Sequence, residues 1–421
     1  MYALVDCNNF FVSCERAFQP WLEKRPVVVL SNNDGCVVAR SNESKPLVPM
    51  GTPFFKLKGL VDSGKIEVRS SNYTLYGDLS RRVMNILAST GLPLEKYSID
   101  EAYLDLEGLP AEQQRPFCLA LVRKIRKWTG IPVSIGIAPT KTLGKVANHF
   151  AKRYPGYKGV CVIDSDEKRE KALSLTTIDD VWGIGWRSAP KLMSLGVHTA
   201  LDFVQRPESW VQKHMGIVGV RTWRELQGER AVAEDRDERR QSICTSRSFA
   251  ELVQDSAELS LRVSDFAGIC AEKLRHDRSR CRSVGVFIHT SRFRKDLPQY
   301  YPFVQVRLDT PSNDTETIVG AALKAFRRAY KPGYLYKRAG VTVDDITASD
   351  YLEASLFETP SEALRREKND TVSALMDHFN SAHNNLLRLA SQRSGHYAEG
   401  IRREHCSPLF STEWSDILEI K

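Results

Sequence analysis

The chain has 421 residues, too many for one compact core, and its length predicts roughly two to four domains. Its composition, 42% hydrophobic and 27% charged, is typical of an ordinary globular protein. No apolar run approaches the roughly 20 residues that span a bilayer, and the N-terminus lacks a signal-peptide pattern. We therefore expect a cytoplasmic protein without membrane contact. The nine scattered cysteines favour buried thiols over disulfides or zinc ligands.

The net charge of +8 is concentrated in one region. Residues 260–340 contain 16 Lys and Arg against 7 Asp and Glu. Such a surplus is more often a solvated face than a nucleic-acid footprint, so by itself it leaves both open. Five aromatic residues lie among these cations, and in a strand-rich segment we expect them to fill a core rather than stack on bases: Phe287, Phe293, Tyr300, Tyr301 and Phe303.

In chain order, the first 165 residues alternate between strand-like and helix-like patterns. Strands are predicted at 2–7, 26–31, 66–70 and 133–138, and helices at 80–90, 117–130 and 142–153. The alternation predicts an α+β sheet domain with helices on one face. Residues 179–199 predict two helices joined by the tight turn GIG, and the polar run 230–240 predicts a linker. A mixed α/β region follows to about residue 345.

The stretch YSIDEAYLDL, residues 97–106, places Asp100 beside Glu101 among strand-forming residues. Neighbouring strand residues point to opposite faces, so this pair suits the bend of a hairpin better than the middle of a strand. Asp6 ends the first strand and is the natural third member. Three converging carboxylates require a cation, and oxygen ligands favour Mg²⁺. Spacing alone nevertheless favours turn or cap roles over a metal site.

Six motifs, in this order, resemble those of the Y-family DNA polymerases that copy damaged templates: DCNNFFVSCE, SNESK, SSNYTLYGDLS, YSIDEAYLDL, GIAPTKTLGKVANHFAK and VWGIG. Along essentially its whole length the chain resembles the UmuC branch of that family, the catalytic subunit of bacterial polymerase V and its relatives. The resemblance implies an α+β multidomain fold shaped like a right hand. It has a ferredoxin-like palm, small fingers, a helix-hairpin-helix thumb, an α/β little finger and a C-terminal extension.

The resemblance also implies the domain boundaries. We expect the palm at 1–10 and 71–165, the fingers at 11–70, the thumb at 166–230, a linker at 231–241, the DNA-binding little finger at 242–345 and a C-terminal accessory, partner-binding tail at 346–421. The implied function is error-prone translesion DNA synthesis, which extends primers past damaged bases in an SOS-type response by two-metal nucleotidyl transfer with two Mg²⁺ ions.

Site residues follow from the matching motifs. Asp6, Asp100 and Glu101 match the metal-binding carboxylates, and the backbone carbonyl of Cys7 matches a further metal ligand. Phe11 matches the steric gate, a ring lying under the sugar of the incoming nucleotide that leaves no room for a 2′-hydroxyl. Its neighbour Phe10 is assigned to the same nucleotide pocket, with ordinary core packing as the alternative.

Lysines match the contacts to the triphosphate. Lys45 lies in the fingers motif and Lys152 lies in a predicted helix, where Lys141 and Lys145 share its face. A lysine stripe is most often a solvated surface, and the resemblance assigns only Lys152 to the phosphates. The loop after Lys45 reads PLVPMG, one residue shorter than in relatives and with Pro46 added, so we expect a different loop shape.

DNA contacts are predicted in the thumb. Gly183, Ile184, Gly185 and Lys191 lie in a segment resembling a helix-hairpin-helix, whose amides can bind a DNA phosphate without reading a base. The alternative is a helical hairpin that only needs a tight turn.

The resemblance implies primed DNA template and dNTPs as substrates and a UmuD′-type dimer and RecA filament as partners. A sliding clamp would bind through Leu356 and Phe357, although Glu353 replaces the usual Gln. The protein would act in the bacterial cytoplasm at the nucleoid. Two alternatives remain at this point: a non-catalytic DNA-binding subunit of a repair complex, and another two-metal phosphoryl-transfer enzyme such as a nuclease or nucleotide cyclase.

Overall fold

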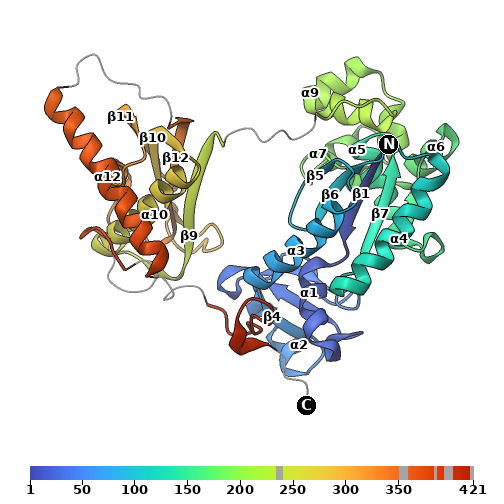
Figure 1. The fold of residues 1–421 in the computed structure, drawn as a ribbon, viewed down its shortest axis with the longest axis horizontal. Coiled ribbons are helices and arrows are strands. Elements are labelled where there is room, and N and C mark those ends of the chain that lie inside the picture. Colours follow the sequence, from blue (N-terminus) through green and yellow to red (C-terminus); the bar gives the residue numbers. More distant parts are fainter. Residues whose placement is uncertain (234–239, 350–358, 384–385, 393–401, 418–421) are drawn as a thin grey trace. The chain divides into compact units, whose positions relative to one another are not determined.

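The computed structural model describes residues 1–233, 240–349, 359–383, 386–392 and 402–417, without the side chains of residues 362 and 363. The chain forms two compact units (Figure 1). Unit 1 comprises Met1–Arg236 together with Arg403–Lys421, and unit 2 comprises Asp237–Arg402. Unit 2 is therefore inserted, in sequence, between two parts of unit 1.

A five-stranded sheet lies at the centre of unit 1. Its strands, in spatial order, are β5 (Leu94–Lys96), β6 (Glu101–Asp105), β1 (Tyr2–Cys7), β7 (Val133–Ala138) and β8 (Val160–Val162). β1 pairs antiparallel with both β6 and β7, and β7 pairs parallel with β8. Every residue of β1 and β7 is buried, because helices cover both faces of the sheet.

The two faces carry different helices. Ala3 and Val5 of β1 pack in one core with α1 (Phe10–Phe18), α3 (Tyr73–Ala88) and α4 (Ala111–Thr129). α5 (Lys141–Arg153) packs on the opposite face, where Leu4 approaches Gly144 of that helix. The prediction of helices on one face was therefore wrong, because β1 carries apolar residues at both its odd and its even positions.

The strands and helices predicted in the first 165 residues are confirmed, with two shifted starts. α4 begins at Ala111, six residues before the predicted helix. α3 begins at Tyr73, seven residues before the predicted helix, because Asn72 caps it. The Oδ1 atom of Asn72 accepts a hydrogen bond from the Leu75 amide at 3.2 Å.

A second, three-stranded sheet lies within residues 11–70, the stretch predicted to form the fingers. Its order is β3 (Val37–Arg40), β2 (Val27–Leu30) and β4 (Glu67–Ser70), and the short helix α2 (Lys58–Asp62) precedes β4. The stretch predicted to form the thumb, residues 166–230, contains α6 (Asp166–Leu175), α7 (Ser188–Ser194), α8 (Ala200–Val204) and α9 (Glu208–Leu226).

One predicted thumb helix is missing from this fully described stretch. Only a 3₁₀ turn at Ile178–Asp180 lies before the GIG turn, where a helix was predicted. Thr177 forms a β-bridge with Thr199, and Gly183 turns the chain with a φ of 91°. The segment between Thr177 and Gly183 is therefore too short to form an α-helix.

Unit 2 is built on a four-stranded antiparallel sheet. Its order is β11 (Phe303–Ser312), β10 (Ser279–Thr290), β12 (Tyr336–Ala348) and β9 (Ser242–Val253). α10 (Ser256–His276) and α11 (Thr315–Ala329) cover one face and share a core with it, whose strand residues include Val284, Val286 and Ile288. We call the opposite face of this sheet the open face.

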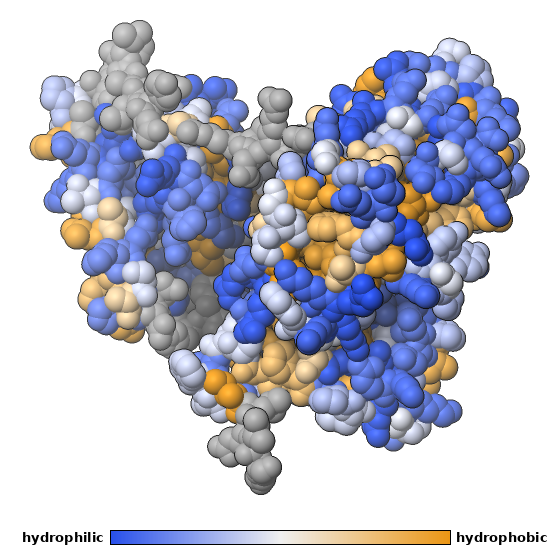
Figure 2. All heavy atoms as spheres, turned by 45° about the vertical axis from the view of Figure 1, so that its right-hand side comes forward, coloured by the Kyte–Doolittle hydropathy of each residue, from blue (hydrophilic) through white to orange (hydrophobic). Residues whose placement is uncertain are grey.

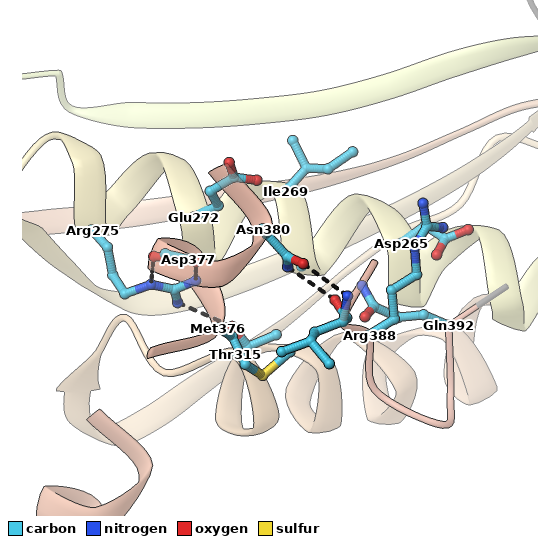
Figure 3. Close-up of a pocket in the computed structure, with 12 residues that line it drawn as sticks. Asp265, Ile269, Glu272, Arg275, Thr315, Met376, Asp377, Asn380, Arg388 and Gln392 are labelled. Atoms are coloured by element: carbon cyan, nitrogen blue, oxygen red, sulfur yellow. Dashed lines mark hydrogen bonds and ion pairs between the residues drawn. The ribbon is translucent and has the colours of Figure 1, made fainter. Parts of the chain in front are cut away.

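The helix α12 (Pro360–Ala382) packs against α10 and α11 around a cavity of about 150 Å³ (Figure 3). Arg275 of α10 donates to both carboxylate oxygens of Asp377 at 2.6 and 2.7 Å. The side chain of Asn380 exchanges hydrogen bonds with the backbone of Leu387. These polar groups bind one another, so the contacts around this cavity hold α12 against the rest of unit 2.

Residues 403–417, which we call the C-terminal segment, return to unit 1. The ring of Phe410 stacks on Phe18 with centroids 4.9 Å apart and belongs to the core beneath the central sheet. Figure 1 shows this dark red segment beside β4 and α2. The stretch expected to form one accessory tail, 346–421, is thus divided between the two units.

Hydrophilic residues cover most of the face shown in Figure 2, and apolar ones gather in one area of unit 1. Among the described residues, the model contains no helix with the length and apolar character needed to cross a membrane.

Candidate active site

The acid pair lies at the bend of a hairpin, as predicted. The amides of Tyr97 and Ser98 donate to the carbonyl of Glu101 at 3.1 and 3.0 Å, which closes the turn between β5 and β6. Glu101, the first residue of β6, lies directly opposite Asp6 of β1. The Cys7 amide donates to the Asp100 carbonyl at 2.9 Å. Strand pairing therefore places the three acids at neighbouring strand ends.

Asp6 and Glu101 carry carboxylates that lie close together and are both bound by lysines of α5. Lys152 Nζ lies 2.6 Å from Asp6 Oδ2, and Lys145 Nζ lies 2.8 and 2.9 Å from the two Glu101 oxygens. Burial raises the pKa of Asp6 to about 6, the Lys152 charge opposes that rise, and the Glu101 charge adds to it. Two adjacent carboxylates repel each other, and the ammonium groups compensate their charge.

Asp100 is oriented differently from the other two acids. Its carboxylate accepts a hydrogen bond from Ser98 Oγ at 2.6 Å, within the hairpin turn. In the part of the chain that the structure describes, no three acidic, histidine or cysteine side chains lie close enough together to hold a metal ion. The structure therefore brings Asp6 and Glu101 together and leaves Asp100 beside them, bound to the turn.

The donor chemistry of these residues fits a hard divalent cation. Aspartate and glutamate oxygens are the ligands that Mg²⁺ prefers. The Cys7 side chain points into the core, and burial raises the pKa of its thiol far above the usual range. Only the backbone of Cys7 is therefore suited to a role in a metal site, in line with the predicted carbonyl ligand.

The two phenylalanines that begin α1 have different surroundings. Phe10 is only 4% exposed and belongs to the core, which favours the alternative of core packing over the predicted place in the nucleotide pocket. Phe11 is partly exposed, and its ring stacks on Tyr76 of α3 with centroids 4.5 Å apart and planes 17° apart. Tyr73 packs against the same ring in a T-shaped arrangement, with ring centroids 5.9 Å apart.

Lys45 interacts electrostatically with Lys152, the lysine that pairs with Asp6. Lys45 Nζ donates to Asn42 Oδ1 at 2.8 Å, and burial together with the charges of Arg40 and Lys152 lowers the pKa of Lys45. Arg40 donates to the Val48 carbonyl at 2.8 Å and so fixes the shortened loop that contains Pro46. The predicted Lys45 and Lys152 thus share one electrostatic environment, and Arg40 is a third member that sequence reasoning missed.

Lys145 was also missed as a site residue. The spacing of Lys141, Lys145 and Lys152 on one helical face contained the signal, but a solvated stripe explains such spacing equally well. In the structure Lys141 is buried and pairs with Glu95 at 2.7 Å. The stripe lies against the acidic strand ends and is not a solvated surface.

The predicted thumb residues form a turn with internal contacts. The Ile184 amide donates to the Val181 carbonyl at 3.0 Å, and Lys191 Nζ donates to the His214 carbonyl at 2.8 Å. A methyl group on Gly183 would lie 2.8 Å from Thr222 Oγ1, so this glycine also allows close packing on α9. The turn is present, and DNA binding by Gly183, Ile184, Gly185 and Lys191 stays a prediction.

The aromatic residues of unit 2 differ from their expected placement. Because Val286 and Ile288 point into the core, the intervening Phe287 lies on the open face, beneath the Arg338 guanidinium at 5.6 Å. Phe293, Tyr301 and Phe303 are exposed, and only Tyr300 packs against the core. The expectation that these rings fill a core was wrong for four of the five. The open face combines aromatic rings with cations.

The fold is that of a known class of polymerases. Solved structures of Y-family DNA polymerases superpose on 82% of this chain and 99% of theirs. An insertion ternary complex of Dbh DNA polymerase gives a TM-score of 0.56, and a Y-family DNA polymerase chimera gives 0.65. Sequence identity is 20% in both cases, so this likeness concerns the fold. The fold of this chain is therefore that of the Y-family DNA polymerases.

The impB/mucB/samB family matches residues 5–149, and its C-terminal domain matches residues 240–356. Protein ImpB of Salmonella typhimurium is 37% identical over 99% of both chains, and Protein UmuC of Salmonella typhimurium LT2 is 37% identical over 100% of both. Protein MucB of Escherichia coli is 36% identical over 99% of both. The chain therefore belongs to the impB/mucB/samB family, the UmuC branch of the Y-family polymerases. It is a DNA-directed DNA polymerase of the translesion class, a class that depends on divalent metal ions.

Proposed function

We propose that unit 1 transfers deoxynucleotides to a primer opposite damaged template bases, as part of an SOS-type response, with Asp6, Asp100 and Glu101 as its metal-binding acids. The observation that carries this proposal is the pairing of Asp6 with Glu101 across the β1–β6 ladder, beside the Asp100 turn. These acids and the Cys7 carbonyl would hold two Mg²⁺ ions, whose charge would favour ionisation of the primer 3′-hydroxyl and stabilise the leaving pyrophosphate.

The residues around the acids bind and orient the nucleotide. Lys152 pairs with Asp6, and its charge lowers the pKa of Lys45. This position beside the acids supports the proposal that its ammonium group binds a triphosphate oxygen. Lys45 and Arg40 add positive charge on the fingers side. Phe11, held against Tyr76, lies under the sugar and excludes a 2′-hydroxyl.

Replacing Asp100 tests the site directly. We expect Asp100→Ala to lower primer extension with Mg²⁺ and dNTPs by roughly a thousandfold or more, because an electrostatic group acting on the reacting phosphate is lost. Affinity for primed DNA should stay close to that of the unmodified protein, measured by fluorescence anisotropy. Asp105→Asn, at the far end of β6, is the matched control and should remain active.

Two results would contradict the proposal. An active Asp100→Ala variant would remove this residue from the site. An unmodified protein that binds primed DNA yet never extends it, with or without partner proteins, would favour the non-catalytic DNA-binding subunit.

We further propose the DNA contacts and partners. The turn at Gly183–Gly185 with Lys191 and the open face of unit 2 bind the primed template through its phosphates. A UmuD′-type dimer and a RecA filament assist the polymerase at the bacterial nucleoid. The proposed clamp contact through Leu356 and Phe357, together with Glu353, lies outside the described residues.

A further inference from the structure

We propose that the C-terminal segment helps to shape the nucleotide pocket. Ser407 positions Glu15 and Tyr76, and these two residues hold the ring of Phe11. Glu15 is then a positioning residue for the choice between deoxyribose and ribose, completed by a residue from the other end of the chain. This inference rests on the role of Phe11 proposed above.

Glu15 is a buried carboxylate that accepts three hydrogen bonds from described side chains. It lies on α1 four residues after Phe11, so both side chains share one face of the helix. Its Oε1 accepts hydrogen bonds from the Tyr76 hydroxyl at 2.7 Å and from Ser407 Oγ at 3.1 Å. Its Oε2 accepts from Gln19 Nε2 at 3.0 Å. A fully buried carboxylate requires such donors, and Ser407 supplies one of three.

Tyr76 connects this carboxylate to the pocket. Its side chain is fully buried, its hydroxyl is bound to Glu15, and its ring stacks on Phe11. The position of the Phe11 ring therefore depends on where Glu15 holds Tyr76. We call Ser407, Glu15, Tyr76 and Phe11 the support chain.

The C-terminal segment is docked by specific hydrogen bonds. Ser70 and His405 exchange two, from the Ser70 amide to the His405 carbonyl and from the His405 amide to Ser70 Oγ, each at 3.0 Å. Asn72 Nδ2 donates to Ser407 Oγ at 3.0 Å and to the Pro408 carbonyl at 3.1 Å.

Farther along, Ser411 Oγ donates to Asp78 Oδ2 at 2.8 Å. Ser70, Asn72, Tyr76 and Asp78 all belong to the motif SSNYTLYGDLS, which holds none of the proposed catalytic acids. This motif therefore forms the surface of unit 1 on which the C-terminal segment docks.

The test measures kcat/KM for a dNTP and for the matching rNTP with the full-length protein. Ser407→Ala removes one donor from Glu15, and we expect it to lower the preference for the dNTP roughly tenfold, the effect of one hydrogen bond to a charged group. Tyr76→Phe keeps the ring but loses its bond to Glu15, and it should act in the same direction. Ser407→Thr keeps the hydroxyl and should restore the preference.

Ser411→Ala is the matched control, because it removes a hydrogen bond of the same segment that does not reach Glu15. Its sugar preference should equal that of the unmodified protein, with the melting temperature of each variant recorded alongside. If Ser407→Ala and Tyr76→Phe lower only the melting temperature and leave the preference unchanged, the segment is merely structural and the inference is overturned. Phe11→Ala separates the two proposals: an unchanged preference in that variant defeats the steric gate itself.

Discussion

Burial of Asp6 raises its pKa and so affects how its carboxylate can bind a cation. The side chain lies in the central sheet at the end of β1, and burial raises its pKa to about 6 in spite of the neighbouring Lys152. A cation that binds the ionised carboxylate must therefore displace a proton below that pH. The same burial would help to confine a bound ion to the strand ends.

This pKa makes the metal requirement depend on pH. At subsaturating Mg²⁺ we expect incorporation to fall about tenfold per pH unit below pH 6, since each ion then competes with one proton. Raising the Mg²⁺ concentration should move the midpoint to lower pH, because the ion binds only the ionised form. Single-turnover incorporation between pH 5 and 8 measures both effects. A midpoint that does not respond to Mg²⁺ would show that Asp6 ionisation is not coupled to the ion.

At the scale of elements, the site depends on the close packing of α5 against β7. Gly136 makes this approach possible, since a methyl group there would lie 2.1 Å from the Gly144 carbonyl oxygen and 2.3 Å from the Asn148 nitrogen. Asn148 in turn donates to the carbonyls of Leu4 and Ser134 at 3.3 and 2.7 Å, which fixes the helix to the sheet. Both Lys145 and Lys152 lie on this helix.

Two glycine substitutions test this packing. Gly136→Ala should lower the free energy of unfolding by about 3 kcal/mol, because backbone atoms must move apart. Gly144→Ala is the matched control on the facing helix, where the nearest atom would lie at an ordinary 3.7 Å. Alanine favours a helix interior, so we expect this variant to unfold within about 1 kcal/mol of the unmodified protein. Urea unfolding measures the free energy of unfolding of both variants. Equal values for Gly136→Ala and Gly144→Ala would contradict the packing argument.

At the scale of the whole molecule, the two units have separate cores but are not separate in sequence. Unit 2 has its own core between the sheet and α10 and α11, whereas unit 1 includes the buried Phe410 from the far end of the chain. A chain shortened before residue 403 would thus lose part of unit 1 and not a free tail.

Unit 2 should fold and bind DNA by itself. We expect a fragment of residues 240–392 to melt cooperatively by circular dichroism and to bind duplex DNA with an affinity that falls linearly on a log–log plot against salt. Arg338→Ala, on the open face, should reduce the slope by about one, because one phosphate contact is lost. Lys324→Ala, on α11, is the control and should leave the slope unchanged. The same slope in both variants would exclude the open face as the DNA surface.

Local pattern predicted much of the fold and part of the site. Alternation and apolar runs located β1, β2, β4 and β7, and the position of two adjacent acids indicated a hairpin bend. Contacts between distant segments could not be predicted in this way. The helix on the second face of the sheet, the aromatic rings on the open face and the pairing of Lys145 with Glu101 depend on how elements pack.

The sequence by itself determined the class of this protein through resemblance, because six motifs occur in the order found in Y-family polymerases. Only the tertiary structure decided which side chains of these motifs meet. It joined Asp6 to Glu101 through strand pairing, turned the Asp100 carboxylate toward Ser98, and brought Ser407 to Glu15 across nearly the whole chain. The physical reason is that motif spacing reports local geometry, whereas burial, charge compensation and hydrogen-bond partners arise between segments that folding alone brings together.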